Sequence, residues 1–178
     1  MSLFLLGIFF IPMVAIAIII KASSKGTVLY WSERIGINNG IFDMPKFRTM
    51  HSGTPTVATH LLANPEVYLT PVGSFLRKFS LDELPQLWSI LKGDMSFVGP
   101  RPALYNQDDL IELRTQEGIH RLVPGVTGWA QINGRDDISI PVKVTFDQYY
   151  LENKSFLFDL KILYMTTIKV LKADGVQH

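Results

Sequence analysis

The stretch Ser80–Gln86 (SLDELPQ) contains two adjacent carboxylates, Asp82 and Glu83, in a setting that suits chemistry on a phosphate. An aspartate can act as a nucleophile toward phosphoryl groups, and carboxylate oxygens are ligands that Mg²⁺ prefers. Arg77 and Lys78 stand just before the pair. These residues suggest a centre in which one carboxylate attacks a phosphate, the other holds a metal, and nearby cations neutralise the oxygens.

The same residues also allow a purely structural interpretation. Ser80 and Glu83 have the spacing of a capping box, in which the two side chains satisfy the first amides of a helix. Asp82 would then only interact favourably with the helix dipole. Pro85 implies that such a helix starts late or bends, because proline is costly beyond the first turn.

Several other cations are candidates for binding phosphate oxygens, since arginine can contact them in bidentate fashion. Lys46 and Arg48 lie in the segment IFDMPKFRTM, Arg101 stands between two prolines, and Arg135 follows an Asn-Gly turn. Each of them taken alone predicts a surface salt bridge. A shared site with Asp82 is the better account only if they converge in the fold.

The N-terminal segment is apolar and predicts association with a membrane. Residues Leu3–Ile20 carry no charge over 18 positions, close to the length of about 20 that a spanning helix needs. Pro12 in its middle should bend the helix, so the residues allow either a kinked span or a re-entrant hairpin. Lys21 and Lys25 place the following end on the cytoplasmic side.

Size and composition limit the remaining function classes. The 178 residues suffice for one domain with a core, with a boundary expected between residues 1–21 and 22–178. The net charge of +1 argues against a nucleic-acid partner, and there is no cysteine for a disulfide or a cysteine zinc site. The four histidines show no metal-ligand spacing.

The rest of the chain predicts an α+β fold that is mainly helical and includes a small β-hairpin. Turn signals and hydrophobic periodicity define the elements. We expect strands at 27–31 and 41–50 around a turn at 38–40, and a short strand at 129–132. We expect residues 76–92 to be mainly helical, a helix within 103–118, and a helix at 159–172.

The last of these helices is amphipathic. One face carries the apolar residues, flanked by lysines 161, 169 and 172. We expect this face to cover the core, although lysines beside an apolar stripe also suit a membrane surface. The face consists of Leu160, Leu163, Tyr164, Ile168 and Leu171.

Four motifs together resemble the bacterial sugar transferases, the small monotopic phosphoglycosyl transferases of membrane glycan assembly. They are KFRTM, SLDELPQL, LKGDMSFVGPRP and PGVTGWAQINGR, in the order in which that family has them. The resemblance extends from about Ile11 to Gly175. It implies a re-entrant membrane helix with interfacial amphipathic helices, and a catalytic domain on the cytoplasmic face of the bacterial inner membrane.

The resemblance also implies a reaction. Such enzymes transfer a sugar-1-phosphate from a UDP-sugar to a polyprenyl phosphate, usually undecaprenyl phosphate, and release UMP with the help of Mg²⁺. Asp82 would be the nucleophile that forms a phosphosugar-enzyme intermediate, and Glu83 would bind the metal. Arg48, Arg77 and Arg101 would hold phosphates.

For the uridine, the resemblance indicates the segment from Gln131 to Arg135, with Arg135 foremost. The chain departs from the family at Ile11, where a serine usually precedes the membrane proline. Neither the sugar nor the existence of a homodimer follows from the sequence.

Two other functions are compatible with parts of the pattern. A membrane-anchored protein that binds nucleotide sugars, or acts as a scaffold, would need the cations but not the carboxylate pair. A metal-dependent lipid phosphatase would use the aspartate with water as the acceptor. Release of UMP from a UDP-sugar, and its dependence on a lipid acceptor, distinguishes the three.

Overall fold

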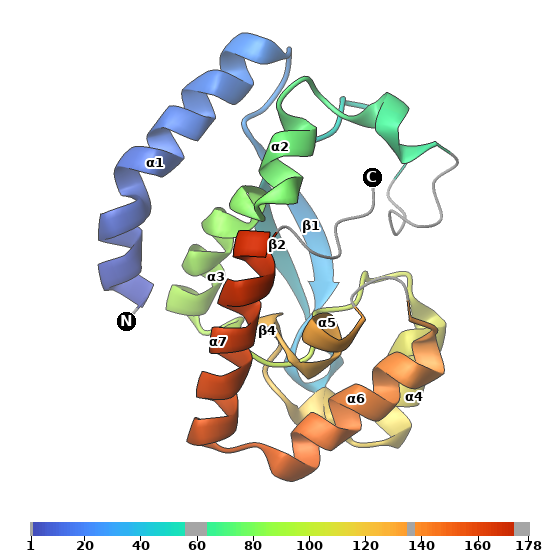
Figure 1. Cartoon of the computed structure of the whole chain (residues 1–178). Coiled ribbons are helices and arrows are strands. Elements are labelled where there is room, and N and C mark those ends of the chain that lie inside the picture. Colours follow the sequence, from blue (N-terminus) through green and yellow to red (C-terminus); the bar gives the residue numbers. More distant parts are fainter. Residues whose placement is uncertain (1, 56–63, 135–137, 173–178) are drawn as a thin grey trace.

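The computed structural model describes residues 2–55, 64–134 and 138–172, and in it helices surround a central β-hairpin (Figure 1). This architecture confirms the predicted mainly helical α+β fold with a small hairpin. The helices are α1 (Ser2–Ser23), α2 (Gly73–Lys78), α3 (Leu87–Lys92), α4 (Asp108–Gln116), α5 (Trp129–Asn133), α6 (Ile140–Asn153) and α7 (Phe156–Lys172). The strands are β1 (Leu29–Ile35), β2 (Ile41–Phe47), β3 (Ser96–Val98) and β4 (Gly125–Thr127). Short 3-10 helices are η1 (Ile37–Asn39), η3 (Pro65–Tyr68), η4 (Leu81–Gln86) and η5 (Ile119–Arg121).

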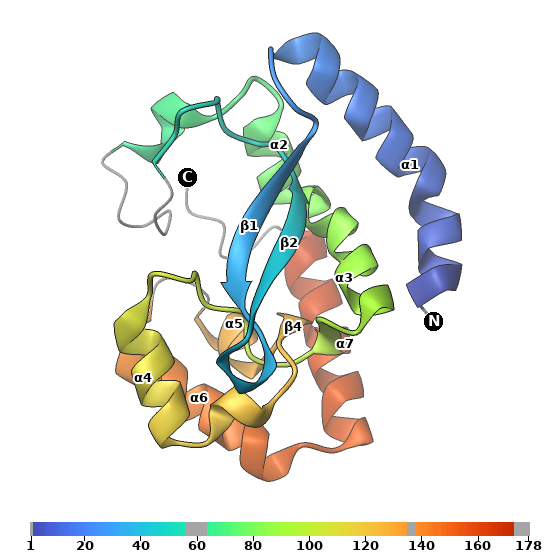
Figure 2. The same cartoon turned by 180° about the vertical axis from the view of Figure 1, so that it is seen from behind.

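Helix α1 lies along the outside of the molecule (Figures 1 and 2). Its stretch Leu5–Ser23 is long and apolar enough to cross a membrane, and almost none of it is buried within the protein. Near the end of the helix Ile20 is fully buried and packs with Phe47 and Leu76. The helix continues through Pro12 without a break, so a re-entrant hairpin and a boundary at residue 21 stay predictions.

The predicted hairpin is confirmed and is longer than expected at its first strand. β1 and β2 pair antiparallel, from Leu29 opposite Phe47 to Ile35 opposite Ile41. Asn38 and Asn39 at the turn have φ values of 53° and 60°, the left-handed region that asparagine tolerates better than most residues. In this two-stranded sheet each strand has an open edge, which accommodates Pro45 in β2.

Residues 76–92 are mainly helical, as predicted, but one continuous helix is wrong there, because the chain forms α2, η4 and α3. Ser80 causes the first break with φ 54°, and its side chain makes no capping hydrogen bond, so the capping box is not formed. Pro85 lies inside η4. Gly93 ends α3 in the left-handed region, as predicted.

The strand expected at 129–132 is also wrong, since these residues form α5. The amide of Ile132 donates to Gly128, and Ile132 packs with Tyr150 of α6 and Ile162 of α7. Burial against two helices thus outweighs the strand propensity of the Trp and Ile side chains. The strand lies just before it, as β4, which pairs parallel with β3.

Two further helices were expected, and one differs in orientation. Helix α4 lies within the predicted 103–118. Helix α7 was predicted well in extent, but its buried face is centred on Ile162 and not on the predicted apolar stripe. Leu160 and Tyr164 of that stripe are exposed, at 46% and 69%. Part of this face therefore points away from the core.

Candidate active site

Asp82 and Glu83 lie in η4, which packs against β2. The left-handed turn at Ser80 and the compact 3-10 helix direct both carboxylates toward the hairpin and not along a solvent-exposed helix face. Asp82 is 8% exposed, and the Glu83 side chain is 16% exposed. Carboxylates are seldom buried to this degree without partners.

Glu83 is held by two cations at one oxygen. Arg101 Nη2 lies 2.8 Å and Lys46 Nζ lies 3.1 Å from Glu83 Oε1. Burial on its own would raise the pKa of Glu83, but the charges and hydrogen bonds of Arg101 and Lys46 outweigh it and hold this pKa well below its usual range. Burial lowers the pKa of Lys46, against the attraction of Glu83. Glu83 is therefore ionised throughout the neutral pH range.

Asp82 has the opposite electrostatic character. Burial raises its pKa to about 6, and the negative charge of Glu83 adds to the rise, while Lys46, Arg77 and Arg101 oppose it. Two adjacent carboxylates thus have pKa values pushed apart, a pattern typical of groups with different catalytic roles. Asp82 is the one with no ion pair within the described residues, so it can interact with a substrate.

The predicted arginines separate into two groups. Arg101 contacts Glu83, and the charge of Arg77 acts on Asp82 while its Nε donates to Thr49 Oγ1 at 3.0 Å. Arg48 lies elsewhere, with its guanidinium against the chain that leaves α1. It donates to the carbonyls of Ser24 and Lys25 and to Ser24 Oγ. Arg48 Nε is buried and has no hydrogen-bond partner among the described residues, so the role of Arg48 in phosphate binding stays a prediction.

The predicted uridine-binding segment is only partly described. Gln131 Nε2 donates to the carbonyl of Val126 at 2.9 Å, and Gln131 Oε1 is buried without a partner among the described residues. Arg135 lies outside the described residues. The role of this segment stays a prediction.

The carboxylates fit the predicted Mg²⁺ only in part. Within the described residues no group of three or more His, Asp or Glu side chains converges, so no all-protein metal site is present there. Mg²⁺ is commonly bound by one or two carboxylates together with substrate phosphates. The described contacts of Glu83 use only Oε1, so Glu83 and Asp82 fit a Mg²⁺ that arrives with a diphosphate.

Lys46 is the functional residue whose role the sequence did not reveal. It was a candidate cation beside Arg48, yet it is the one that reaches the carboxylate pair. The available signal was a lysine within the mainly hydrophobic segment IFDMPKF, because a lysine that becomes buried needs an acidic partner. Two adjacent carboxylates, one of them held by cations, lie next to a helix suited to a membrane. This is the kind of centre expected for phosphoryl transfer at a bilayer.

Comparisons with known proteins agree with this class. The family of bacterial sugar transferases matches residues 1–173. The uncharacterized sugar transferase EpsL of Bacillus subtilis is 43% identical over 162 residues, which cover 90% of this chain and 78% of the relative. The chain therefore belongs to the bacterial sugar transferase family.

Two further relatives are longer proteins that carry names for specific reactions. The undecaprenyl-phosphate galactose phosphotransferase of Salmonella typhimurium is 38% identical over 167 residues, covering 84% of this chain and 34% of the relative. The UDP-galactose-lipid carrier transferase of Erwinia amylovora is 35% identical over 184 residues, covering 93% of this chain and 38% of the relative. The similarity thus extends over most of this chain but over only part of each of these two proteins.

Proposed function

We propose that the protein transfers a sugar-1-phosphate from a UDP-sugar to undecaprenyl phosphate and releases UMP, through a covalent intermediate on Asp82. The observation that carries this proposal is the unequal carboxylate pair. Glu83 is fixed and ionised between Arg101 and Lys46, whereas the adjacent Asp82 is buried and has no ion pair within the described residues. The names of the two longer relatives, which include undecaprenyl phosphate and UDP-galactose, support this choice of acceptor and donor.

In the first step the Asp82 carboxylate attacks the β-phosphorus, which bears the sugar. A bond forms between a carboxylate oxygen and this phosphorus, and the bond from the phosphorus to the bridging oxygen of the diphosphate breaks. The leaving group is UMP, which takes the bonding electron pair. Arg101 and Arg77 contribute positive charge beside Asp82, which offsets the charge on the phosphate oxygens.

In the second step an oxygen of the lipid phosphate attacks the same phosphorus. The bond to Asp82 breaks, the carboxylate is restored, and the product is a lipid-linked sugar diphosphate. Because one centre serves the two substrates in turn, the kinetics are ping-pong.

Glu83 with Asp82 would hold Mg²⁺, and the bound ion would add neutralisation of the diphosphate charge. Lys46 and Arg101 keep the Glu83 carboxylate ionised and fix its Oε1 atom. We further propose that Gln131 and Arg135 belong to the segment that meets the uridine.

We propose a monotopic attachment at the cytoplasmic face of the bacterial inner membrane. Support comes from α1, which is apolar and exposed and has Lys21 in its last turn. A helix anchored in the bilayer keeps Asp82 near the depth of lipid phosphates, because η4 contacts α1.

The covalent intermediate provides the decisive experiment. Purified protein in lipid nanodiscs is mixed with UDP-sugars and Mg²⁺ without the lipid acceptor, quenched and analysed by intact-protein mass spectrometry. We expect one equivalent of UMP and a mass increase of one sugar phosphate, both absent in Asp82→Asn. Product formation without this adduct would refute the covalent route. Binding of UDP-sugar without UMP release would instead favour a nucleotide-sugar binding protein without catalysis.

A further inference from the structure

The segment from Pro100 to Ala103 brings Arg101 to the carboxylate pair, and its four consecutive carbonyls all have hydrogen-bond partners. Two partners are backbone amides and two are arginine side chains. In chain order they are the Gly125 amide (2.9 Å), Arg114 Nη1 (2.8 Å), Arg34 Nη1 (3.1 Å) and the Ile35 amide (3.0 Å).

Arg114, the partner of the Arg101 carbonyl, is itself held in a buried ion pair. It comes from α4, and its Nε and Nη2 donate to Asp147 Oδ2 of α6 at 3.0 and 2.6 Å. Asp147 is 1% exposed, so this carboxylate has no access to solvent or substrate. The charge of Asp147 is matched by Arg114. The third nitrogen of the guanidinium, Nη1, donates to the carbonyl of Arg101.

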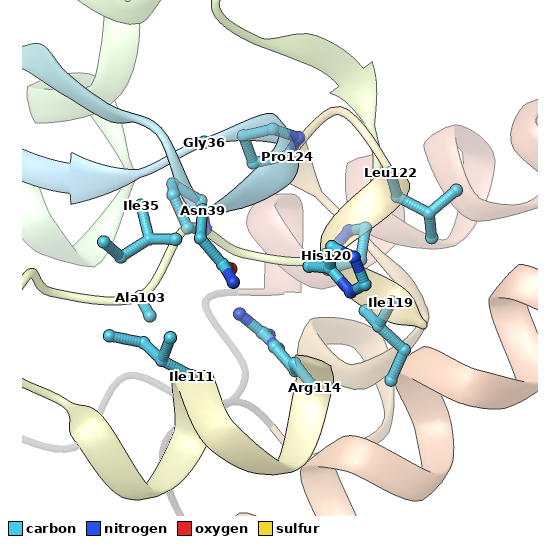
Figure 3. Close-up of a pocket in the computed structure, with 12 residues that line it drawn as sticks. Ile35, Gly36, Asn39, Ala103, Ile111, Arg114, Ile119, His120, Leu122 and Pro124 are labelled. Atoms are coloured by element: carbon cyan, nitrogen blue, oxygen red, sulfur yellow. The ribbon is translucent and has the colours of Figure 1, made fainter. Parts of the chain in front are cut away.

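The packing around the segment is close at Ala103, which is 3% exposed, but leaves a small gap beside it. A cavity of about 30 Å³ lies against it, lined by Pro100, Pro102, Ala103 and Arg114 among others. Figure 3 shows Arg114 reaching from α4 toward this cavity beside Ile111. The hydrogen bond from Arg114 thus restrains the Arg101 carbonyl beside a small gap in the packing.

We propose that Arg114 and Asp147 act as a positioning pair, which fixes the backbone of Arg101 so that its guanidinium meets Glu83. This inference rests on the proposed function and adds to it two residues that are remote from the reacting atoms. A guanidinium fixed in advance loses less entropy when a phosphate binds, and its misplacement lowers the rate even if the protein stays folded.

The alternative is that the pair only stabilises the fold. Removing one partner cannot distinguish the two roles, since an unpaired buried charge destabilises a protein on its own account. Replacing both partners by apolar residues of similar size is often neutral for stability. It nevertheless removes the donor to the Arg101 carbonyl.

The experiment therefore uses the double variant Arg114→Met with Asp147→Leu. We expect a melting temperature close to that of the wild type and a loss of about 10–100-fold in kcat for UMP release, as is typical when supporting partners of a site are removed. In an Arg101→Ala background the same double change should cause no further loss, because the pair acts through Arg101. Full activity of the folded double variant, or additive losses, would overturn the proposal.

Two further variants control for general damage to the core and for a double variant that does not fold. Tyr150→Phe on α6 removes a buried hydroxyl that donates to Asp159 at 2.8 Å and lies 3.5 Å from the Val98 carbonyl, but is not a partner of any of the four Pro100–Ala103 carbonyls, and should leave kcat unchanged. If the double variant does not fold, Arg114→Lys keeps a charge for Asp147 but cannot make all three hydrogen bonds. Arg114→Lys should then reduce kcat in the wild-type background and cause no further loss of kcat in the Arg101→Ala background.

Binding of UDP in the presence of Mg²⁺, measured by calorimetry, separates this inference from the proposed reaction. Weaker binding in the double variant but not in Tyr150→Phe supports the positioning pair even if the wild type releases no UMP. If the wild type releases no UMP but the double variant binds UDP more weakly, the proposed reaction is refuted and the positioning role of Arg114 and Asp147 is not. Equal binding in all three proteins, with equal kcat, refutes the pair.

Discussion

Lys46 Nζ lies 3.1 Å from Glu83 Oε1, and the two residues are 37 positions apart in the chain. This contact joins β2 of the hairpin to η4 and concentrates positive charge on the same oxygen that Arg101 contacts. It explains how a carboxylate can stay ionised while buried next to a second carboxylate. It also makes the energetic role of Lys46 measurable.

Lys46→Met should destabilise the protein by about 1–3 kcal/mol, because Glu83 keeps its charge and loses a charged hydrogen-bond partner. The same change in a Glu83→Gln background should cost less, since Lys46 has then lost its hydrogen-bonded carboxylate and keeps only the charge interaction with Asp82. Denaturant unfolding of the wild type, the two single variants and the double variant measures the coupling energy between Lys46 and Glu83. Lys92→Met is the matched control: it breaks the more exposed Lys92–Asp94 pair and should change stability by less than about 0.5 kcal/mol. Equal losses with and without Glu83 would contradict the pairing.

The pKa of Asp82 predicts the pH dependence of the donor half-reaction. With a pKa raised to about 6, Asp82 is mostly ionised at neutral pH. It is protonated, and so not nucleophilic, below that value. The rate of UMP release should therefore be nearly constant above about pH 7 and fall tenfold per unit well below pH 6. The reaction is best followed without the lipid acceptor, whose phosphate has a second pKa near 6 of its own.

This prediction is checked by rapid-quench measurement of UMP release, with circular dichroism at each pH to confirm that the protein stays folded. A flat profile down to about pH 5 would exclude a nucleophile with a raised pKa.

Gly99→Ala should distort the chain just before the segment that carries Arg101. A Cβ at Gly99 would meet backbone atoms, namely the carbonyl of Val123 and, at 2.9 Å, the amide nitrogen of Gly125. Backbone cannot move aside as a side chain can, so we expect a loss of about 1–3 kcal/mol. For a chain of this size this lowers the melting temperature by about 2–4 °C per kcal/mol. Gly40→Ala, with only the Ile37 carbonyl at 3.3 Å, should be tolerated; an equal effect would contradict the argument.

The sequence predicted the parts of the fold and site that depend on neighbouring residues. The Asn-Asn-Gly turn predicted the hairpin, and the adjacency of Asp82 and Glu83 made them the candidate pair. The break at Ser80 was missed because a capping box and helix periodicity both favour a continuous helix there. Ser80 takes a left-handed conformation, which non-glycine residues seldom adopt.

Contacts between distant segments were beyond reach from the sequence. The parallel pairing of β3 with β4, and the meeting of Lys46 with Glu83, depend on the packing of the whole chain. The position of the Arg48 side chain was also beyond reach. Its place in the KFRTM motif suggested a phosphate ligand, whereas in the fold it donates to the carbonyl of Ser24, just after α1. The residue types of Lys46 and Arg48 indicated that each charge needs a partner, but not which residue that partner is.

Trp88 offers a direct test of the membrane attachment. It lies on α3, is 50% exposed, and its helix contacts α1. If α1 lies in the bilayer, Trp88 should lie at the interface, where tryptophan is favoured. Its fluorescence in the Trp31→Phe, Trp129→Phe protein should then be quenched strongly by brominated lipids and weakly by acrylamide. Trp31 is similarly exposed but lies on the hairpin strand β1, so the protein that keeps only Trp31 should show the reverse. Equal quenching of the two tryptophans by brominated lipids would mean that α3 does not face the membrane.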